Sequence, residues 1–327
     1  MHYQKIYFGA PGTGKSHKID EDLKGVHKSC ITRVVIHPEF SYSDFVGQLL
    51  PDHDSSGHLE FKFKRGPFTE ALAAAFADQK REVYLVIEEL SRGNVAAIFG
   101  DLFQLLDRNS SFRSVLEVTN ANIANEIPTL VGNDIYLPSN FNILCTVNLN
   151  DQNVNPMDTA FKRRFEWEYI STVPANIPGT NTIDSKLNNP KLIIVDNSVV
   201  TTTWQSFYMA LNSFILDKTE GLGRREDKQV GQFFILFDKK IVSDSHSSDP
   251  AISSAAKAQI DNIIKNKLLM YLWQDVQGYS RSNGSISLFS DSINSYQDLY
   301  TTYGEKKVFS DEFINGFLIP NATKYPY

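Results

Sequence analysis

The chain has 327 residues, of which 42% are hydrophobic and 21% are charged, and its formal net charge is −6. This length exceeds the size at which one hydrophobic core usually stops growing, so two domains are expected, and the composition excludes a mainly disordered chain. The negative charge excludes a surface that binds nucleic acid over its whole extent, so any DNA contact must be local or supplied by a partner.

The chain lacks the sequence features of a membrane or secreted protein. Its longest apolar run, residues 71–77, is far shorter than the roughly 18 to 20 residues that cross a bilayer. No basic region leads into an apolar block and a cleavage site at the N-terminus. Cys30 and Cys145 lack metal-ligand spacing and are expected to be buried, reduced thiols. These features predict a cytoplasmic protein.

Short apolar runs alternate with helical patterns through about residue 170. Nearly continuous apolarity is typical of strands buried on both faces, so the runs predict a parallel sheet in an α/β domain. The four runs are Lys5–Phe8, Thr32–Ile36, Val83–Ile87 and Phe141–Val147. Apolar residues at helical spacing predict one helix from Phe68 to Phe76 and another from Val95 to Leu106. Ser114–Thr119 and Asp134–Leu137 are expected to form a protruding hairpin.

The second half of the chain has a different pattern. Residues 171–203 are rich in Pro, Asn and Thr, which indicates a linker or irregular segment and places a domain boundary there. Apolar residues then recur at helical spacing in residues 204–215 and 263–272. The expected organisation is an α/β domain at 1–170, a linker, and a smaller, mainly helical domain at 204–327.

A glycine-rich segment near the N-terminus matches the pattern G-x-x-x-x-G-K-[ST], between an apolar strand and a polar helical start. Glycines let successive backbone N–H groups turn toward phosphate oxygens, and the following helix presents its positive end to the same anion. Lys15 would reach the β- and γ-phosphates, and Ser16 would offer its hydroxyl to Mg²⁺. The predicted nucleotide-binding residues are Gly9, Ala10, Pro11, Gly12, Thr13, Gly14, Lys15 and Ser16.

The strand predicted at Val83–Ile87 is followed by two carboxylates. This form is expected when the first acid, Glu88, holds the metal and its water shell and the second, Glu89, polarises a nucleophilic water. The alternative is a pair of solvated acids at a strand terminus. Glu88 stands where aspartate is usual, and its extra methylene predicts a weaker affinity for the metal.

At this point the sequence resembles the motor subunits of the McrB family, which are AAA+ nucleotidases of modification-dependent restriction systems. The match covers most of the chain and keeps the order of the family's motifs. The matching segments are His37–Phe45, Ile87–Asn94, Thr146–Gln152, Asp158–Phe165, Gly221–Phe234 and Lys267–Asp275. The resemblance implies an AAA+ core with a parallel sheet flanked by helices, and a helical lid that closes over the nucleotide.

The resemblance also assigns site residues. Asn148 would sense the γ-phosphate, and Asp151 would organise the attacking water or contacts of the neighbouring subunit. Arg163 or Arg164 would neutralise charge at the γ-phosphate of an adjacent subunit, whereas the alternative makes both part of a solvated basic turn.

The family further implies Mg²⁺, either GTP or ATP, a homo-oligomeric ring expected to be hexameric, and DNA translocation or restriction with a McrC-like nuclease. DNA would be reached through that complex. Two other functions are considered: a nucleotide-binding scaffold without useful turnover, and a MoxR-type AAA+ chaperone that acts on protein. Eight residues precede Gly9 in this sequence, and the DNA-reading domain that accompanies many family members is not expected within it, so the resemblance leaves the choice between GTP and ATP open.

Overall fold

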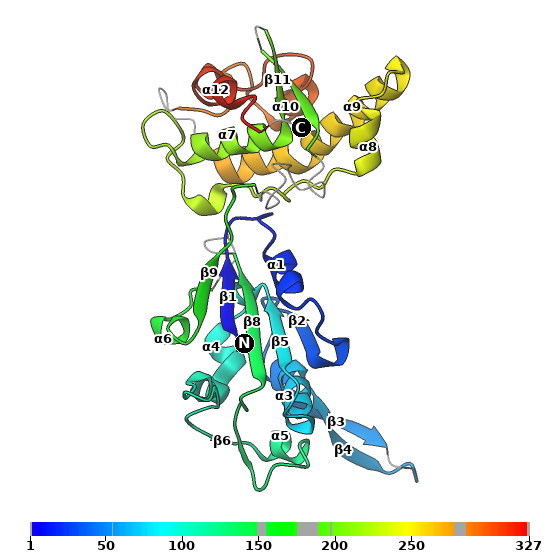
Figure 1. Ribbon diagram of the computed structural model, residues 1–327, viewed down its shortest axis with the longest axis vertical. Coiled ribbons are helices and arrows are strands. Elements are labelled where there is room, and N and C mark those ends of the chain that lie inside the picture. Colours follow the sequence, from blue (N-terminus) through cyan, green and yellow to red (C-terminus); the bar gives the residue numbers. More distant parts are fainter. Residues whose placement is uncertain are drawn as a thin grey trace. The chain divides into compact units, whose positions relative to one another are not determined.

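The computed structural model describes residues 2–53, 55–148, 155–174, 189–196, 198–277 and 286–325. The chain forms two compact units (Figure 1). The first comprises Met1–Phe8 and Lys15–Tyr169, and the second comprises Gly9–Gly14 and Ile170–Tyr327. The second unit includes the expected helical domain at 204–327 together with residues 170–203. The loop Gly9–Gly14, expected to be part of the first domain, clusters with the second unit.

The first unit contains a five-stranded sheet in the order β2-β5-β8-β1-β9. Every neighbouring pair of these strands is parallel, which confirms the predicted sheet (Figure 1). The strands are β1 (Gln4–Phe8), β2 (Ile31–Val35), β5 (Val83–Glu88), β8 (Phe141–Val147) and β9 (Glu166–Tyr169). Strand β9 was not predicted, because a short edge strand that alternates acidic and aromatic residues lacks the continuous apolarity of its buried neighbours.

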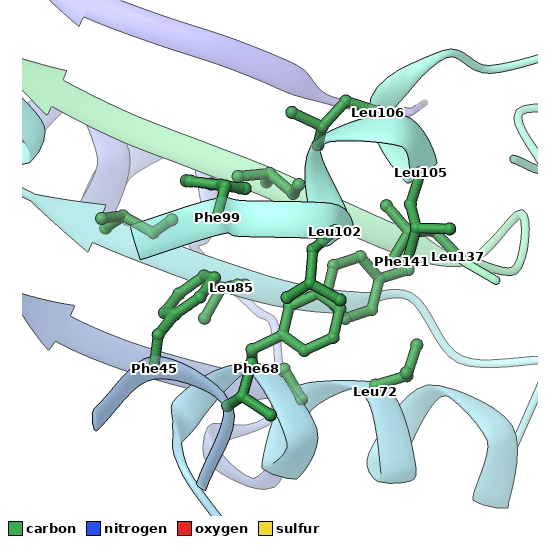
Figure 2. Close-up of a cluster of buried hydrophobic side chains, with 14 of the residues drawn as sticks. Phe45, Phe68, Leu72, Leu85, Phe99, Leu102, Leu105, Leu106, Leu137 and Phe141 are labelled. Carbon is green, nitrogen blue, oxygen red and sulfur yellow. The ribbon is translucent and has the colours of Figure 1, made fainter. Parts of the chain in front are cut away.

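Helices pack the faces of this sheet through large apolar side chains. They are α1 (Lys15–Asp22), α2 (Tyr42–Val46), α3 (Pro67–Ala77), α4 (Val95–Phe99) and α6 (Thr159–Lys162), with 3₁₀ turns at Lys28–Cys30, Leu90–Arg92 and Gly100–Leu106. Figure 2 shows Phe45, Phe68, Phe99 and Phe141 converging in one buried cluster. Cys30 and Cys145 are buried and free, as predicted.

The helix predicted from Val95 to Leu106 is interrupted. Its α-helical part ends at Phe99, because Gly100 adopts a φ of +51° that does not continue an α-helix. The rest forms the 3₁₀ segment Gly100–Leu106, whose apolar residues Leu102 and Leu105 are still buried. The apolar stripe therefore predicted the buried face correctly but not the kind of helix.

The first unit also carries two small hairpins. Strands β3 (Gly47–His53) and β4 (Leu59–Arg65) form a projecting antiparallel hairpin that was not predicted (Figure 1). The hairpin expected within residues 114–137 is present in reduced form, as two-residue strands β6 (Val118–Thr119) and β7 (Asp134–Ile135) separated by helix α5. Helix α5 spans Ala121–Asn125.

The second unit is mainly helical around an aromatic core that includes Trp204, Phe207 and Phe309. Its helices are α7 (Trp204–Leu216), α8 (Lys239–Asp244), α9 (Pro250–Ile264), α10 (Tyr296–Thr302), α11 (Asp311–Phe313) and α12 (Ile319–Asn321), with a 3₁₀ turn at Glu226–Lys228 and π-helical turns at Lys265–Leu269, Leu272–Gln277 and Ile314–Leu318. Among the described residues, no helix is both long and apolar enough to cross a bilayer.

The linker expected at residues 171–203 is partly wrong. Strands β10 (Lys191–Val195) and β11 (Val199–Thr203) form an antiparallel hairpin within it. Both strands are rich in β-branched residues, which outweigh the nearby proline and asparagine that suggested an irregular segment. Residues 175–188 lie outside the described residues.

Candidate functional site

The glycine-rich loop joins the end of β1 to the start of α1, which is the context that a phosphate loop requires. Gly12 has a φ of +76°, a conformation that favours glycine. A Cβ at this position would lie 2.4 Å from the backbone N of Phe234, so there is also no room for a side chain. Because Gly12 has no side chain, the backbone N–H groups of the loop can be approached closely by an anion.

Lys15 and Ser16 occupy the first turn of α1, directly after the loop. Lys15 is only 8% exposed, so the chain positions this ammonium group instead of leaving it in solvent. The N-terminal turn of a helix also carries a partial positive charge. Lys15 and the start of α1 could therefore act as donors to phosphate oxygens.

Glu88 lies at the carboxyl end of β5, and its carboxylate is bound by two side chains. Ser16 donates its hydroxyl to Glu88 Oε2 at 2.6 Å, and Arg33 Nη1 donates to Glu88 Oε1 at 2.6 Å. The longer side chain of Glu88 therefore reaches the predicted metal-binding serine directly. A hydroxyl next to a carboxylate fits Mg²⁺, which takes oxygen ligands and commonly uses few protein groups together with nucleotide phosphates.

Arg33 is a site residue that sequence reasoning missed. It lies on β2, which pairs with β5 so that Val35 is opposite Glu88. Arg33 also forms an ion pair with Asp20 of α1. Partial burial alone would lower the pKa of Arg33, but the hydrogen bonds with Asp20 and Glu88 raise it overall. The available signal was a lone cation within an otherwise uncharged strand run.

Glu89 immediately follows β5 in a left-handed backbone conformation, with φ 56° and ψ 37°. This conformation is uncommon for a residue other than glycine and is typical of functional sites. Its backbone N–H donates to Thr146 Oγ1 at 3.1 Å, which helps to hold the turn. The left-handed conformation of Glu89 therefore ends strand β5 and changes the direction of the chain.

The Glu89 carboxylate accepts hydrogen bonds from the side chain of Asn148. Asn148 Nδ2 lies 3.0 Å from Glu89 Oε2 and 3.1 Å from Oε1. Arg92 Nε also contacts Glu89 Oε2, at 3.2 Å. Strands β5 and β8 are adjacent, with Ile87 opposite Cys145, so the residues that follow them emerge side by side. Asp151 falls within residues 149–154, outside the described residues.

The two candidate arginines at the end of α6 have different surroundings. Arg164 is 10% exposed; it donates to Asp107 Oδ2 at 2.6 Å and to Ala160 O at 2.8 Å, and it lies 4.2 Å from the centre of the Phe103 ring. Arg163 is exposed, and within the described residues its guanidinium has no hydrogen-bond, ion-pair or ring partner. Arg164 is thus committed to its own unit, whereas Arg163 remains accessible.

Comparison with known proteins identifies the family of the chain. Residues 6–165 match the AAA domain of the dynein-related subfamily. The chain is 32% identical over 324 residues to YdiS, a component of the type II restriction enzyme BsuMI of Bacillus subtilis, and the match covers 89% of this chain and 85% of YdiS.

A second relative is the EcoKMcrB subunit of a type IV methyl-directed restriction enzyme of Escherichia coli. It is 25% identical over 170 residues, covering 50% of this chain but only 34% of that protein. A crystal structure of a Cytophaga hutchinsonii protein has 18% identity and a TM-score of 0.33, covering 51% of this chain and 41% of that one, and so weak a likeness adds nothing to the assignment. The extended match to YdiS, together with the AAA domain and the similarity to McrB, shows that the chain belongs to the McrB-like family of AAA+ nucleoside triphosphatases.

Proposed function

We propose that the chain hydrolyses GTP or ATP in a ring of identical subunits and thereby drives DNA translocation or restriction together with a McrC-like nuclease. The observation that carries this proposal is the set of contacts at the ends of β5 and β8. Glu88 accepts a hydrogen bond from the hydroxyl of Ser16, which is predicted to bind Mg²⁺, and the next residue, Glu89, accepts hydrogen bonds from Asn148. These contacts support a metal-binding pair, Ser16 and Glu88, next to a base, Glu89, although the contacting residues are far apart in the sequence.

Binding would use the backbone of the loop together with the first turn of α1. Successive N–H groups from Gly9 to Gly14 would surround the phosphates, and the Lys15 ammonium would bind the β- and γ-phosphate oxygens. Ser16 and Glu88 would hold Mg²⁺, which neutralises charge between the phosphates when it is bound. Arg33 limits this role, because it already binds one of the two oxygens of Glu88.

Hydrolysis would use Glu89 as the general base. Glu89 accepts the proton of a water whose oxygen bonds to the γ-phosphorus, while the bond from that phosphorus to the β,γ-bridging oxygen breaks. The Glu89 carboxylate accepts hydrogen bonds from Asn148 and Arg92. At least one of these hydrogen bonds must break before Glu89 can bind the attacking water. Asn148 Nδ2 would then be available to a γ-phosphate oxygen, which supports a sensing role. Asp151 is proposed by resemblance alone.

Arg163 would complete the site of a neighbouring subunit. An inserted guanidinium neutralises charge that develops on the transferred phosphoryl group. The accessibility of Arg163 and the engagement of Arg164 within its own unit favour Arg163 for this role. Two relatives are components of restriction enzymes, which supports a restriction role and a nuclease partner. The hexameric ring is proposed from the family resemblance, and the cytoplasmic location is proposed from the sequence features.

A scaffold that binds nucleotide without useful turnover is the second candidate, because Ser16 and Arg33 occupy both carboxylate oxygens of Glu88. Hydrolysis of GTP and ATP measured over a wide range of protein concentration separates the two functions. The proposal expects turnover per subunit to rise with concentration and to rise further with a McrC-like protein. Nucleotide binding without turnover under every condition would favour the scaffold, and stimulation by protein clients alone would favour a MoxR-type chaperone.

A further inference from the structure

A segment of the second unit lies directly against the phosphate loop. Gly231 N donates to Pro11 O at 2.8 Å, and Phe233 N donates to Gly12 O at 2.7 Å. Both hydrogen bonds engage carbonyl groups of the loop. The loop must turn its N–H groups toward an anion, so fixing its carbonyl groups from another segment restricts the peptide planes that carry those N–H groups.

Gly12 in the loop and Gly231 in the facing segment make this contact sterically possible, because neither position has room for a side chain. A Cβ on Gly231 would lie 2.3 Å from the backbone C of Gly12 and 2.3 Å from Thr13 N. Real Cβ atoms essentially never approach backbone this closely, so a side chain here would have to move one of the two segments. Gly231 is not among the glycines with positive φ, so space rather than backbone conformation requires glycine at this position.

The segment is itself anchored to helix α7. Asn212, only 2% exposed, donates Nδ2 to Val230 O and accepts from Val230 N through Oδ1, both at 2.8 Å. Trp204 Nε1 donates to Gln232 O at 3.2 Å. Buried hydrogen bonds with well-matched partners rigidify the groups that they join. A continuous path of hydrogen bonds therefore runs from α7 through residues 230–233 to the loop.

We propose that residues 230–234 act as a strap that holds the phosphate loop in its anion-binding conformation and couples occupancy of the loop to helix α7. This inference rests on the proposed function and adds positioning residues to it: Gly231, which allows the close approach, and Asn212, which anchors the strap. A loop held in its bound conformation before the ligand arrives loses less entropy on binding, so the strap raises nucleotide affinity without touching the nucleotide. The strap therefore acts on binding, not on the chemical step.

Substitution of Gly231 in the full chain tests the strap. We expect Gly231→Ala to weaken binding of fluorescent GDP and ADP analogues at least about tenfold, because the added Cβ displaces the strap from the loop. Gly316→Ala is the matched control, since Gly316 is in the same unit and a Cβ there meets nothing within 4 Å. We expect this control to change affinity less than about twofold.

Hydrogen exchange of the unsubstituted chain provides a second measurement that does not depend on how the variant folds. The strap requires slow exchange of the Gly231 and Phe233 amides without nucleotide, and slower exchange when nucleotide is added. Unprotected amides at these two positions, or wild-type affinity in Gly231→Ala, would overturn the strap alone. If the unsubstituted chain bound neither nucleotide, the proposed function would fail and the strap with it, which is a distinct result.

Discussion

The predicted phosphate loop (the backbone part) and the residues predicted to act in hydrolysis (the side-chain part) fall in different units and are held by different kinds of contact. In the first unit, the contacts are hydrogen bonds between side chains: Ser16 donates to Glu88, and Asn148 donates to Glu89. In the second unit, the loop Gly9–Gly14 is held by backbone hydrogen bonds from Gly231 and Phe233. The comparison suggests a division of labour in which the side-chain part controls hydrolysis and the backbone part controls affinity. Changes confined to one part should leave the property of the other nearly intact.

The largest effect is expected from Arg163, which would add a catalytic side chain from outside both parts. Arg163→Ala should lower turnover by about 10³-fold or more, because a guanidinium at the γ-phosphate stabilises charge in the transition state. Steady-state hydrolysis at saturating nucleotide and high protein concentration measures this loss. Lys162→Ala is the control, as it removes the neighbouring exposed cation. Equal losses in both variants would point to general electrostatics instead of an inserted arginine.

The next largest effect should come from Glu89 within the side-chain part. Glu89→Gln keeps the shape of the side chain but removes its basicity, so turnover should fall by about 10²- to 10⁴-fold. Nucleotide affinity should change by less than about threefold, since the phosphate-binding groups are untouched. Measuring affinity and turnover on the same preparation checks both expectations. Unchanged phosphate release would remove Glu89 from the mechanism.

Arg164 should affect stability rather than catalysis. Arg164→Ala removes an ion pair with Asp107, a hydrogen bond to Ala160 O and a contact with the Phe103 ring. The free energy of unfolding of the first unit should fall by about 2 kcal/mol, because Asp107 loses its partner and a largely buried cation is deleted. Thermal or denaturant unfolding measures this change. Arg163→Ala should leave stability within about 0.5 kcal/mol.

The smallest effect concerns Arg33, which binds the carboxylate that would hold the metal. Arg33→Gln removes a positive charge that competes with Mg²⁺ for Glu88, so half-maximal nucleotide binding should need roughly threefold to tenfold less Mg²⁺. Titration of Mg²⁺ at fixed nucleotide measures the change, and Arg33→Lys, which keeps the charge, is the control. A higher Mg²⁺ requirement in Arg33→Gln would mean that Arg33 orients Glu88 and does not compete for it.

The sequence predicted the elements whose signal is local. Four of the five strands of the sheet follow from apolar runs, and the structure confirms them. The phosphate loop follows from one motif and lies between β1 and α1 as expected, but it clusters with the second unit. The hairpin β3–β4 was missed because its strands are exposed, so continuous apolarity does not mark them. The end of helix α4 was missed because a single glycine conformation changed the helix type.

Contacts between distant positions could not be read from the sequence. Arg33 and Glu88 form a hydrogen bond because β2 and β5 are neighbours in the sheet. The residues of the two strands do not determine the order of strands in the sheet. Gly231 lies far from the loop in sequence, and its importance depends on space that only the fold defines. Sequence patterns also could not separate Arg163 from Arg164, because their difference depends on the packing of Phe103 and Asp107.

The division between the two parts can be tested most directly by comparing Glu89→Gln and Gly231→Ala side by side, with nucleotide affinity and single-turnover hydrolysis at saturating nucleotide measured for both. The account predicts opposite outcomes: Glu89→Gln binds normally but hydrolyses at least about 100-fold more slowly, whereas Gly231→Ala binds at least about tenfold more weakly but hydrolyses at nearly the normal rate once saturated. If both variants lost affinity and rate together, the two parts would not be separable and the account would be wrong.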